Sequence, residues 1–337
     1  MKVGIIGAGL QGKRRASVFP TKQGSTIEGV ACGHEDDLRS AILLAEATHT
    51  QAHSNWNKII SNPQIDAVIV ATPPNSHAEI SIKAMNAGKH VLCEKPLSRT
   101  IQEGEEMIEI AKQTGRTLKC GFNHRHHPGV LQARKWVDLG LIGELDFSRC
   151  QYGIGGRPGY ENEWRANPKL VSGGQLMEQG IHAIDLFRWF LGNLNEVAAF
   201  VSTMYWKIKP LEDNAFVLLR SRDQKIAELH SSLTYWKNRF SLEIHGHEGY
   251  IMVDGLGGSY GVETATLGKR DFDKPFAEEK IEYRGQDQSW KNEWDEFESA
   301  IREHRQPLGS AVDGLEAMRL VKAAYESNRT RAVVDLE

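Results

Sequence analysis

The residues best suited to chemistry lie in the segment 172–192, where an imidazole and two carboxylates share one side of a predicted helix. Ser172 is the expected N-cap of this helix and Gly192 its expected end. Glu178, His182 and Asp185 stand at i, i+4 and i+7, so they form a polar stripe beside an apolar face. Neighbouring carboxylates can fix the tautomer of an imidazole and raise its pKa, which suits proton transfer. The alternatives are a stripe that meets solvent and a histidine satisfied in the core, and the spacing leaves both open.

A glycine-rich turn near the start of the chain is a second group of candidates. Residues 2–6 predict a short strand, residues 7–12 read GAGLQG, and residues 13–19 predict a helix. In this context the glycines permit a tight turn, let a pyrophosphate approach the backbone and let the helix pack on the strand. The sequence therefore predicts dinucleotide binding by Gly7, Gly9, Leu10, Gln11 and Gly12.

The elements that must position these residues alternate between strand and helix. We expect strands at 26–32, 66–71 and 90–93 and helices at 37–47 and 77–87. Ligands of open α/β sheets bind at the carboxyl ends of the strands. The residues that follow the last two strands are therefore expected to contact the cofactor: Thr72, Pro73, Asn75, His77, Glu94 and Lys95.

The second strand departs from a plain NAD pattern. The acid that would bond the ribose 2′-hydroxyl is expected about 20 residues after the glycines, and that place reads Cys32, Gly33, His34. The acidic residues at 35–37 lie slightly beyond the expected position. His34 or the arginines at 14–15 could bind the 2′-phosphate of NADP. The sequence predicts NAD or NADP, with NADP slightly favoured and with Gly33 and His34 near the ribose.

Composition excludes several classes of protein. With 337 residues the chain is long enough for two domains. Its 41 basic and 44 acidic residues give a net charge of -3 with no basic stripe, which argues against a nucleic-acid partner. No apolar run is long enough to span a membrane, and no signal peptide is expected before the first strand. The four cysteines are scattered along the chain, which is typical of reduced thiols. A cytoplasmic protein is therefore expected.

The second half has a different pattern. After a helix at 129–139, the predicted strands are 145–153, 196–206, 214–221, 225–234, 239–245 and 250–253. The expected fold is α/β, with a Rossmann domain at 1–121 and, at 122–337, an α+β domain built on a large open, mostly antiparallel sheet. Because such a sheet leaves a face or an edge exposed, a homodimer or homotetramer formed through it is expected.

Five motifs together resemble one family. They are GAGLQG at 7–12, ATPPNSH at 71–77, CEKPLS at 93–98, GFNHR at 121–125 and GGQLMEQGIHAIDLFRWFLG at 173–192. In combination they resemble the Gfo/Idh/MocA oxidoreductases, named for glucose-fructose oxidoreductase and inositol dehydrogenase. The resemblance spans nearly the whole chain, and it implies a Rossmann domain followed by a sheet domain used for oligomerisation.

The resemblance also implies roles for individual residues. Lys95 matches the lysine of the EKP motif, which bonds the reacting hydroxyl, and His182 matches the general acid/base. Glu178 matches a position that is commonly aspartate, so a direct part in proton transfer stays open beside a tuning role. Asp185 matches an orienting or structural aspartate. The implied reaction is hydride transfer between the nicotinamide and a hydroxyl or carbonyl carbon of a sugar, polyol or nucleotide sugar.

Substrate and metal residues are harder to assign. Polar and aromatic side chains near the expected cleft suit a polyhydroxylated ring, and arginines leave room for an anionic or nucleotide-linked sugar. The candidates for substrate binding, beside Lys95, Glu178 and His182, are Asn123, Arg125, Tyr160, Trp164 and Arg165. The histidines at 124, 126 and 127 and at 245 and 247 lack the spacing of a catalytic zinc site, so no metal is predicted.

Two other functions stay open at this point. The family also contains glycosidases that hold NAD and cleave a glycosidic bond through transient oxidation, and a non-catalytic cofactor sensor is the second alternative. The presence of both Lys95 and His182 argues against the sensor.

Overall fold

The computed structural model describes residues 1–19, 24–33, 37–275 and 277–336. The chain forms two compact units. The first contains Met1–Phe122, Lys169–Ser172 and Trp290–Leu315, and the second contains Asn123–Pro168, Gly173–Ser289 and Glu316–Glu337.

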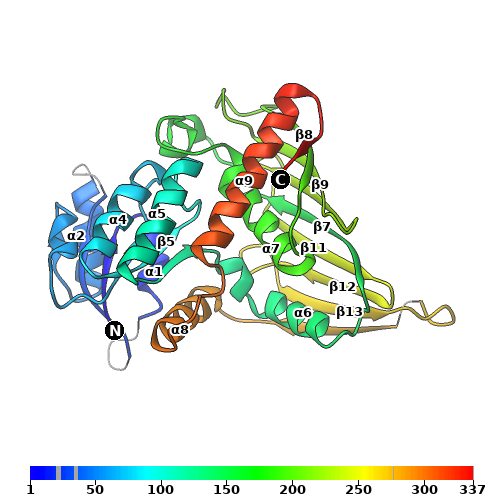
Figure 1. Ribbon diagram of the computed structural model, residues 1–337, viewed down its shortest axis with the longest axis horizontal. Helices are drawn as coiled ribbons and strands as arrows, with labels where there is room; N and C mark the ends of the chain where they lie inside the picture. Colours follow the sequence, from blue (N-terminus) through cyan, green and yellow to red (C-terminus); the bar gives the residue numbers. More distant parts are fainter. Residues whose placement is uncertain (20–23, 34–36, 276, 337) are drawn as a thin grey trace. The chain divides into compact units, whose positions relative to one another are not determined.

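The first unit is built on a parallel sheet in the order β3-β2-β1-β4-β5-β6. This is the strand order of a dinucleotide-binding Rossmann fold. The strands are β1 Lys2–Ile6, β2 Thr26–Ala31, β3 Ala52–His53, β4 Ala67–Val70, β5 His90–Glu94 and β6 Leu118–Gly121. The helices are α1 Leu10–Ala16, α2 Leu38–Ala47, α3 Asn57–Ile60, α4 His77–Asn86, α5 Ile101–Thr114 and α8 Ser289–Arg302, several of which are labelled in Figure 1.

Burial explains why these strands read as continuous apolar runs. All four residues of β4 are buried, as expected of a parallel strand covered on both faces. The core of the unit also includes side chains from α8, since Trp294 and Phe297 pack into the cluster that contains Ile5 and Leu92. The segment 290–315, which lies by sequence in the predicted second domain, therefore packs in the first unit.

Helix α5, which the sequence analysis does not predict, has clear boundary signals. The Thr100 side chain accepts a hydrogen bond from the Glu103 N–H at 3.2 Å, and the Glu103 carboxylate accepts from the Thr100 N–H at 3.0 Å. This reciprocal pair is a capping box. Gly115 ends the helix in the left-handed conformation, with φ of 64°.

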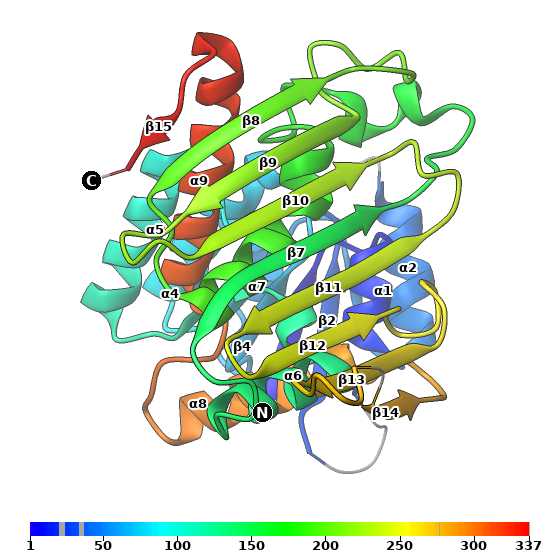
Figure 2. The ribbon, with the colours of Figure 1, turned by 90° about the vertical axis from the view of Figure 1, so that its right-hand side faces the viewer.

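The second unit carries a nine-stranded sheet in the order β14-β13-β12-β11-β7-β10-β9-β8-β15. Figure 2 shows these strands face on. They are β7 Leu145–Gly153, β8 Glu196–Ser202, β9 Asn214–Arg220, β10 Ile226–Ser232, β11 Arg239–Gly246, β12 Gly249–Asp254, β13 Glu263–Lys269, β14 Glu278–Tyr283 and β15 Val334–Asp335. In the part of this sheet that the structure describes, only β7 and β10 pair in parallel. The helices α6 Pro128–Asp138 and α7 Ile181–Leu191 pack on this sheet, and α9 spans Ala311–Thr330.

Alternating burial along the strands gives this sheet one packed and one exposed face. In β9 the residues alternate after Ala215, with Val217 and Leu219 buried and Phe216 and Leu218 exposed. Phe216 lies opposite Phe200 of β8 in the ladder, and Phe200 is 81% exposed. The outer face therefore carries large apolar side chains.

The predicted fold class is confirmed, while several elements differ in length or were not predicted. The helix predicted at 13–19 begins earlier, at Leu10, and the strand predicted at 196–206 ends at Ser202 because its next residues form a loop around Asp213. The elements absent from the sequence analysis are β3, α3, α5, β6, β13, β14, α8, α9 and β15. Among the described residues, no helix is long and apolar enough to cross a membrane.

Candidate active site

The segment that holds Glu178 and His182 begins with an unusual turn. Residues Leu176–Gly180 form a π-helical turn, and α7 continues from it. Single π turns within helices occur frequently at functional sites. Because this turn contains more residues than an α-helical one, it changes the angular relation between Glu178 and His182 that the regular i, i+4 spacing assumes.

Glu212 caps this helical segment in place of the predicted Ser172. The Glu212 carboxylate accepts hydrogen bonds from the N–H of Gly174 at 3.0 Å, from the N–H of Leu176 at 2.9 Å and from the Tyr325 hydroxyl at 2.8 Å. Burial raises the pKa of Glu212, and these three bonds act in the opposite direction. Ser172 donates instead to the Arg99 carbonyl in the first unit, so its prediction as the N-cap is wrong.

His182 stacks on a second histidine that the sequence analysis considered only as part of a metal cluster. The rings of His124 and His182 have centroids 3.8 Å apart and planes inclined by 20°. His124 Nδ1 lies 3.2 Å from Asn123 Oδ1, and His124 Nε2 lies 2.9 Å from the Tyr152 hydroxyl. Asn123 in turn donates its amide N–H to Ser289 at 2.9 Å.

These contacts orient the ring of His124. Because Asn123 presents its carbonyl oxygen, which can only accept, His124 donates from Nδ1. Nε2 lies within hydrogen-bond distance of the Tyr152 hydroxyl, which can donate or accept. His124 is thus held in a fixed orientation against His182.

Asp185 and Arg125 form a buried pair. Arg125 donates through Nε and a terminal nitrogen to the two oxygens of Asp185, at 2.8 and 2.6 Å, and both side chains are almost fully buried. This two-bond geometry is the strong form of an arginine–carboxylate contact. The structure therefore revises the prediction that Arg125 binds substrate, because these nitrogens are engaged by Asp185.

The remaining substrate candidates in the second unit gather near Glu178. Arg165 Nε lies 3.5 Å from a Glu178 oxygen, and the Arg165 guanidinium lies over the Trp164 ring at 4.3 Å. Burial raises the pKa of Tyr160, and the nearby Glu178 charge raises it further. Asn123 does not join this group through its side chain, which is occupied by His124 and Ser289.

The predicted glycine turn has the shape that a dinucleotide needs. A Cβ on Gly7, whose φ is 100°, would lie 2.5 Å from the Ala71 backbone, and a Cβ on Gly12 would lie 2.0 Å from the Gly7 carbonyl oxygen. In contrast, a Cβ on Gly9 would meet no atom within 4 Å, so Gly9 borders open space. Leu10 is 59% exposed at the start of α1. Gly7 thus suits the tight turn, Gly9 leaves room for a pyrophosphate to approach the backbone, and Gly12 allows the helix to pack closely.

The loop after β4 lies next to Gly33. A Cβ on Gly33 would lie 2.6 Å from Thr72 Cγ2. The Thr72 hydroxyl accepts from Ser76 at 2.8 Å, and the Asn75 N–H donates to the Leu170 carbonyl at 3.1 Å. Pro73 precedes a short 3₁₀ turn. The predicted contact at His34 lies outside the described residues.

Two residues predicted to contact the cofactor have side chains that are bonded inside the first unit. The His77 side chain is fully buried, with its ring nitrogens 2.9 Å from the Pro96 carbonyl oxygen and 2.8 Å from the Thr72 carbonyl oxygen. Glu94 is also buried, with its carboxylate bonded to Arg15. Arg15, considered above for a 2′-phosphate, is therefore engaged inside the unit. Lys95, next in the chain, is half-buried.

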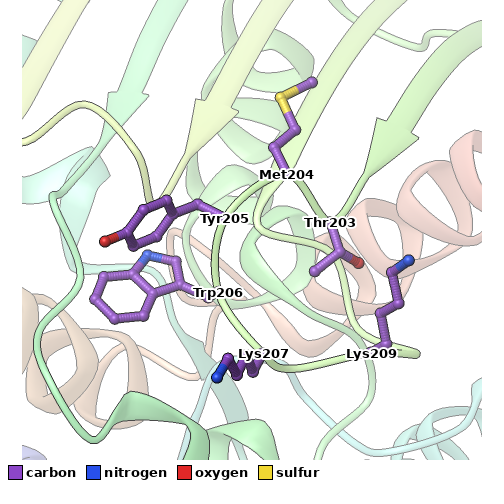
Figure 3. Close-up of a pocket in the computed structure, with 6 residues that line it drawn as sticks. All are labelled: Thr203, Met204, Tyr205, Trp206, Lys207 and Lys209. Carbon is purple, nitrogen blue, oxygen red and sulfur yellow. The ribbon is translucent and has the colours of Figure 1, made fainter.

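A separate hollow lies in the β8–β9 connection. Its cavity of about 410 Å³ is bordered by Thr203, Met204, Tyr205, Trp206, Lys207 and Lys209. Figure 3 shows Tyr205 and Trp206 side by side in this loop, and their ring centroids are 5.2 Å apart. The buried Asp213 carboxylate accepts the N–H groups of residues 204–206. None of the predicted site residues that the structure describes borders this hollow.

Comparison with known proteins identifies the family. A family model described as an oxidoreductase family with an NAD-binding Rossmann fold, GFO/IDH/MocA, matches residues 1–122, and the GFO/IDH/MocA C-terminal domain matches residues 130–252. The chain belongs to the Gfo/Idh/MocA oxidoreductase family. The resemblance inferred from the five motifs is thereby confirmed.

Similar proteins act on different substrates. The chain is 28% identical over 287 residues to a levoglucosan dehydrogenase of Pseudarthrobacter phenanthrenivorans, covering 75% of this chain and 73% of that protein. It is 29% identical over 350 residues to a myo-inositol 2-dehydrogenase of Thermotoga maritima, covering 100% and 99%. A solved levoglucosan dehydrogenase in complex with NADH has a TM-score of 0.89 at 25% identity, covering 100% and 99%.

Proposed function

We propose that this Gfo/Idh/MocA protein is an NAD(P)-dependent dehydrogenase or reductase of a sugar, polyol or nucleotide sugar. The observation that carries the proposal is the placement of His182 against the hydrogen-bonded ring of His124. A fixed imidazole next to substrate is the usual means of moving a hydroxyl proton near neutral pH. The relatives named for levoglucosan and myo-inositol support the class of substrate.

The glycine turn suits the cofactor on physical grounds. The open space at Gly9 leaves the backbone accessible, the tight contact at Gly7 keeps the turn close to Ala71 after β4, and the tight contact at Gly12 keeps α1 close to the turn. A bound NAD or NADP would supply the hydride acceptor or donor. The residues proposed to hold it are Gly7, Gly9, Leu10, Gln11, Gly12, Gly33, Thr72, Pro73 and Asn75.

The chain's own residues divide the remaining work. Lys95 would donate a hydrogen bond from its ammonium group to the reacting oxygen, and His182 would accept or return the hydroxyl proton. Glu178 with Arg165, together with Tyr160 and Trp164, would bind and orient the ring of the substrate. Asn123 and Arg125 are reassigned to positioning, since they hold His124 and Asp185.

The exposed sheet face supports a further proposal about assembly. Phe200, Phe216, Leu218 and Ile226 are all more than two fifths exposed on adjacent strands, with values of 81%, 44%, 53% and 47%. Contiguous exposed apolar side chains of this kind mark interaction surfaces. We propose that a second copy of the chain covers this face in a homodimer or homotetramer.

A substrate screen tests the main proposal. The purified protein is mixed with free sugars, polyols and nucleotide sugars and each of the four cofactor forms, and nicotinamide absorbance is followed. Substrate-dependent net change of absorbance is expected. A Gly9→Val variant is the matched control, because the added side chain enters space free of protein atoms and should block the cofactor without disturbing the fold.

The same screen separates the alternatives. Cleavage of a glycoside without net change in absorbance would support the transient-oxidation glycosidase and overturn the dehydrogenase. Cofactor binding with no turnover of any compound would support the sensor.

A further inference from the structure

Four charged side chains meet inside the first unit, where the proposed chemistry does not use them. They are Arg15 of α1, Glu94 at the end of β5, Lys119 of β6 and Glu293 of α8, and none is more than 4% exposed. The elements that carry them are distant in sequence. Two positive and two negative groups make the cluster neutral.

The contacts within this cluster run through Arg15. Its Nε and a terminal nitrogen lie 2.8 and 2.7 Å from Glu94 Oε1, and its other terminal nitrogen donates to Glu293. The Trp290 ring lies 4.6 Å from the guanidinium, and Lys119 Nζ lies 3.3 Å from the second Glu293 oxygen. Arg15 therefore connects the helix after the glycine turn with β5 and α8.

The second oxygen of Glu94 reaches the backbone of Lys95. The Lys95 N–H donates to Glu94 Oε2 at 3.3 Å. On the other side of Lys95, the Pro96 carbonyl oxygen lies 2.9 Å from His77 Nδ1. Buried side chains thus hold the main chain both before and after the lysine.

Stability alone gives no reason to bury these charges. A buried ion pair loses much of its attraction to the cost of removing its members from water, and well-packed apolar residues are often as stable. What Arg15 provides that an apolar side chain does not is a rigid fork that fixes the Glu94 carboxylate. That carboxylate is then oriented toward the Lys95 N–H.

We propose that Arg15, supported by Glu293, is a positioning residue that holds Glu94 and through it the backbone of Lys95. This inference rests on the proposed function, in which Lys95 contacts the reacting oxygen. A small displacement of a group that contacts the reacting atoms lowers the rate strongly while the affinity for ligands changes little.

Two variants separate positioning from stability. Arg15→Lys keeps a positive charge but replaces the fork with a single ammonium group, so it loosens Glu94. Lys119→Met is the matched control, because it removes a buried charge at the far end of the cluster, where Lys119 contacts Glu293 and the carbonyls of Leu308 and Gly309 but not Glu94. Both variants should lower the thermal unfolding midpoint.

Three measurements are made on each folded variant. They are kcat and KM with the best substrate from the screen, cofactor affinity by fluorescence titration, and deuterium uptake by peptides that contain the Lys95 amide. For Arg15→Lys we expect kcat to fall about 10- to 10²-fold, with KM and cofactor affinity near wild type and faster exchange at Lys95. Lys119→Met should keep wild-type kcat and wild-type exchange at Lys95.

The outcomes that overturn the inference are distinct from failure of the proposed function. Wild-type kcat and amide protection in Arg15→Lys, or an equal loss of kcat in Lys119→Met, would make the cluster merely structural. If the wild-type protein turns over no substrate, the proposed function fails. The deuterium uptake of the two variants still decides whether Arg15 holds the Lys95 backbone.

Discussion

His124 and His182 lie face to face, with ring centroids 3.8 Å apart, and the ring of His124 is itself held by hydrogen bonds to Asn123 and Tyr152. The stack can therefore fix the orientation of His182.

The first prediction follows from this stack. His182→Ala should lower kcat about 10²- to 10⁴-fold, with part of the rate restored at high pH where hydroxide replaces the lost base. His124→Phe, which keeps an aromatic ring but loses the bonds to Asn123 and Tyr152, should cost less. Profiles of kcat/KM against pH for both variants provide the test, and a wild-type profile in His182→Ala would place the base elsewhere.

Lys95 gives the second prediction. Lys95→Met retains the length of the side chain but removes the ammonium group, so kcat should fall about 10²- to 10³-fold, as for loss of one oriented donor. Cofactor affinity, measured by quenching of tryptophan fluorescence, should stay near wild type. A variant that kept most of its kcat would exclude Lys95 from contact with the reacting oxygen.

Sequence patterns predicted the residues whose neighbours are local. The glycine turn depends on spacing within one segment, and the structure places it between β1 and α1. The Glu178, His182, Asp185 stripe assumed regular helical spacing, which the π-helical turn at Leu176–Gly180 interrupts. The partners were not predictable in this way. Asp185 binds Arg125, 60 residues away, and Leu176 is capped by Glu212, 36 residues away.

The missed role of His124 has the same cause. Its neighbours in GFNHR gave no sign of a stack with His182, which depends on how α7 packs beside β7. The side chains of Glu94 and His77 are buried, although both residues were predicted to contact the cofactor, because the end of a strand indicates proximity to a ligand but not the direction of a side chain. The group of histidines at 124, 126 and 127 was the one sequence signal that pointed to this buried polar segment.

Cofactor preference gives the third prediction, and the structure changes its design. Gly33→Asp alone would place its Cβ 2.6 Å from Thr72 Cγ2. The steric clash would then change kcat/KM for both cofactors and obscure the effect of the new charge. Thr72→Ser removes this methyl group and keeps the hydroxyl that accepts from Ser76. Against a Thr72→Ser control, the double variant should shift the ratio of kcat/KM toward NAD, because the new carboxylate repels a 2′-phosphate. An unchanged ratio would remove Gly33 from the ribose site.

The exposed sheet face gives the fourth prediction. Phe200 is 81% exposed in the single chain, so Phe200→Glu should leave the fold intact. If a second copy covers this face, the new charge would be buried at the interface, and sedimentation velocity should show a smaller species than wild type. Leu10→Glu, at an exposed apolar residue of the first unit, is the matched control. An unchanged oligomer in Phe200→Glu would place the interface on another surface.

The fifth prediction concerns pH and His90 at the start of β5. Burial lowers the pKa of His90 from 6.5 to about 4, with the nearby Arg116 charge acting in the same direction, and His90 Nδ1 accepts a hydrogen bond from the Thr117 N–H at 3.0 Å. Because the unfolded chain binds this proton more readily, the contribution of His90 to stability is complete above its unfolded pKa and is lost as the pH falls through the window from 6.5 to about 4. Discounted for partial exposure, the loss should be about 1 to 2 kcal/mol in the free energy of unfolding.

His90→Asn can still accept from Thr117 but does not titrate, so the free energy of unfolding of this variant, measured with urea, should depend less on pH across that window. The same replacement at the exposed His49 controls for the loss of a histidine, since its backbone φ of 55° is one that asparagine tolerates. A pH dependence in His90→Asn as steep as that of wild type would assign the acid sensitivity to other groups.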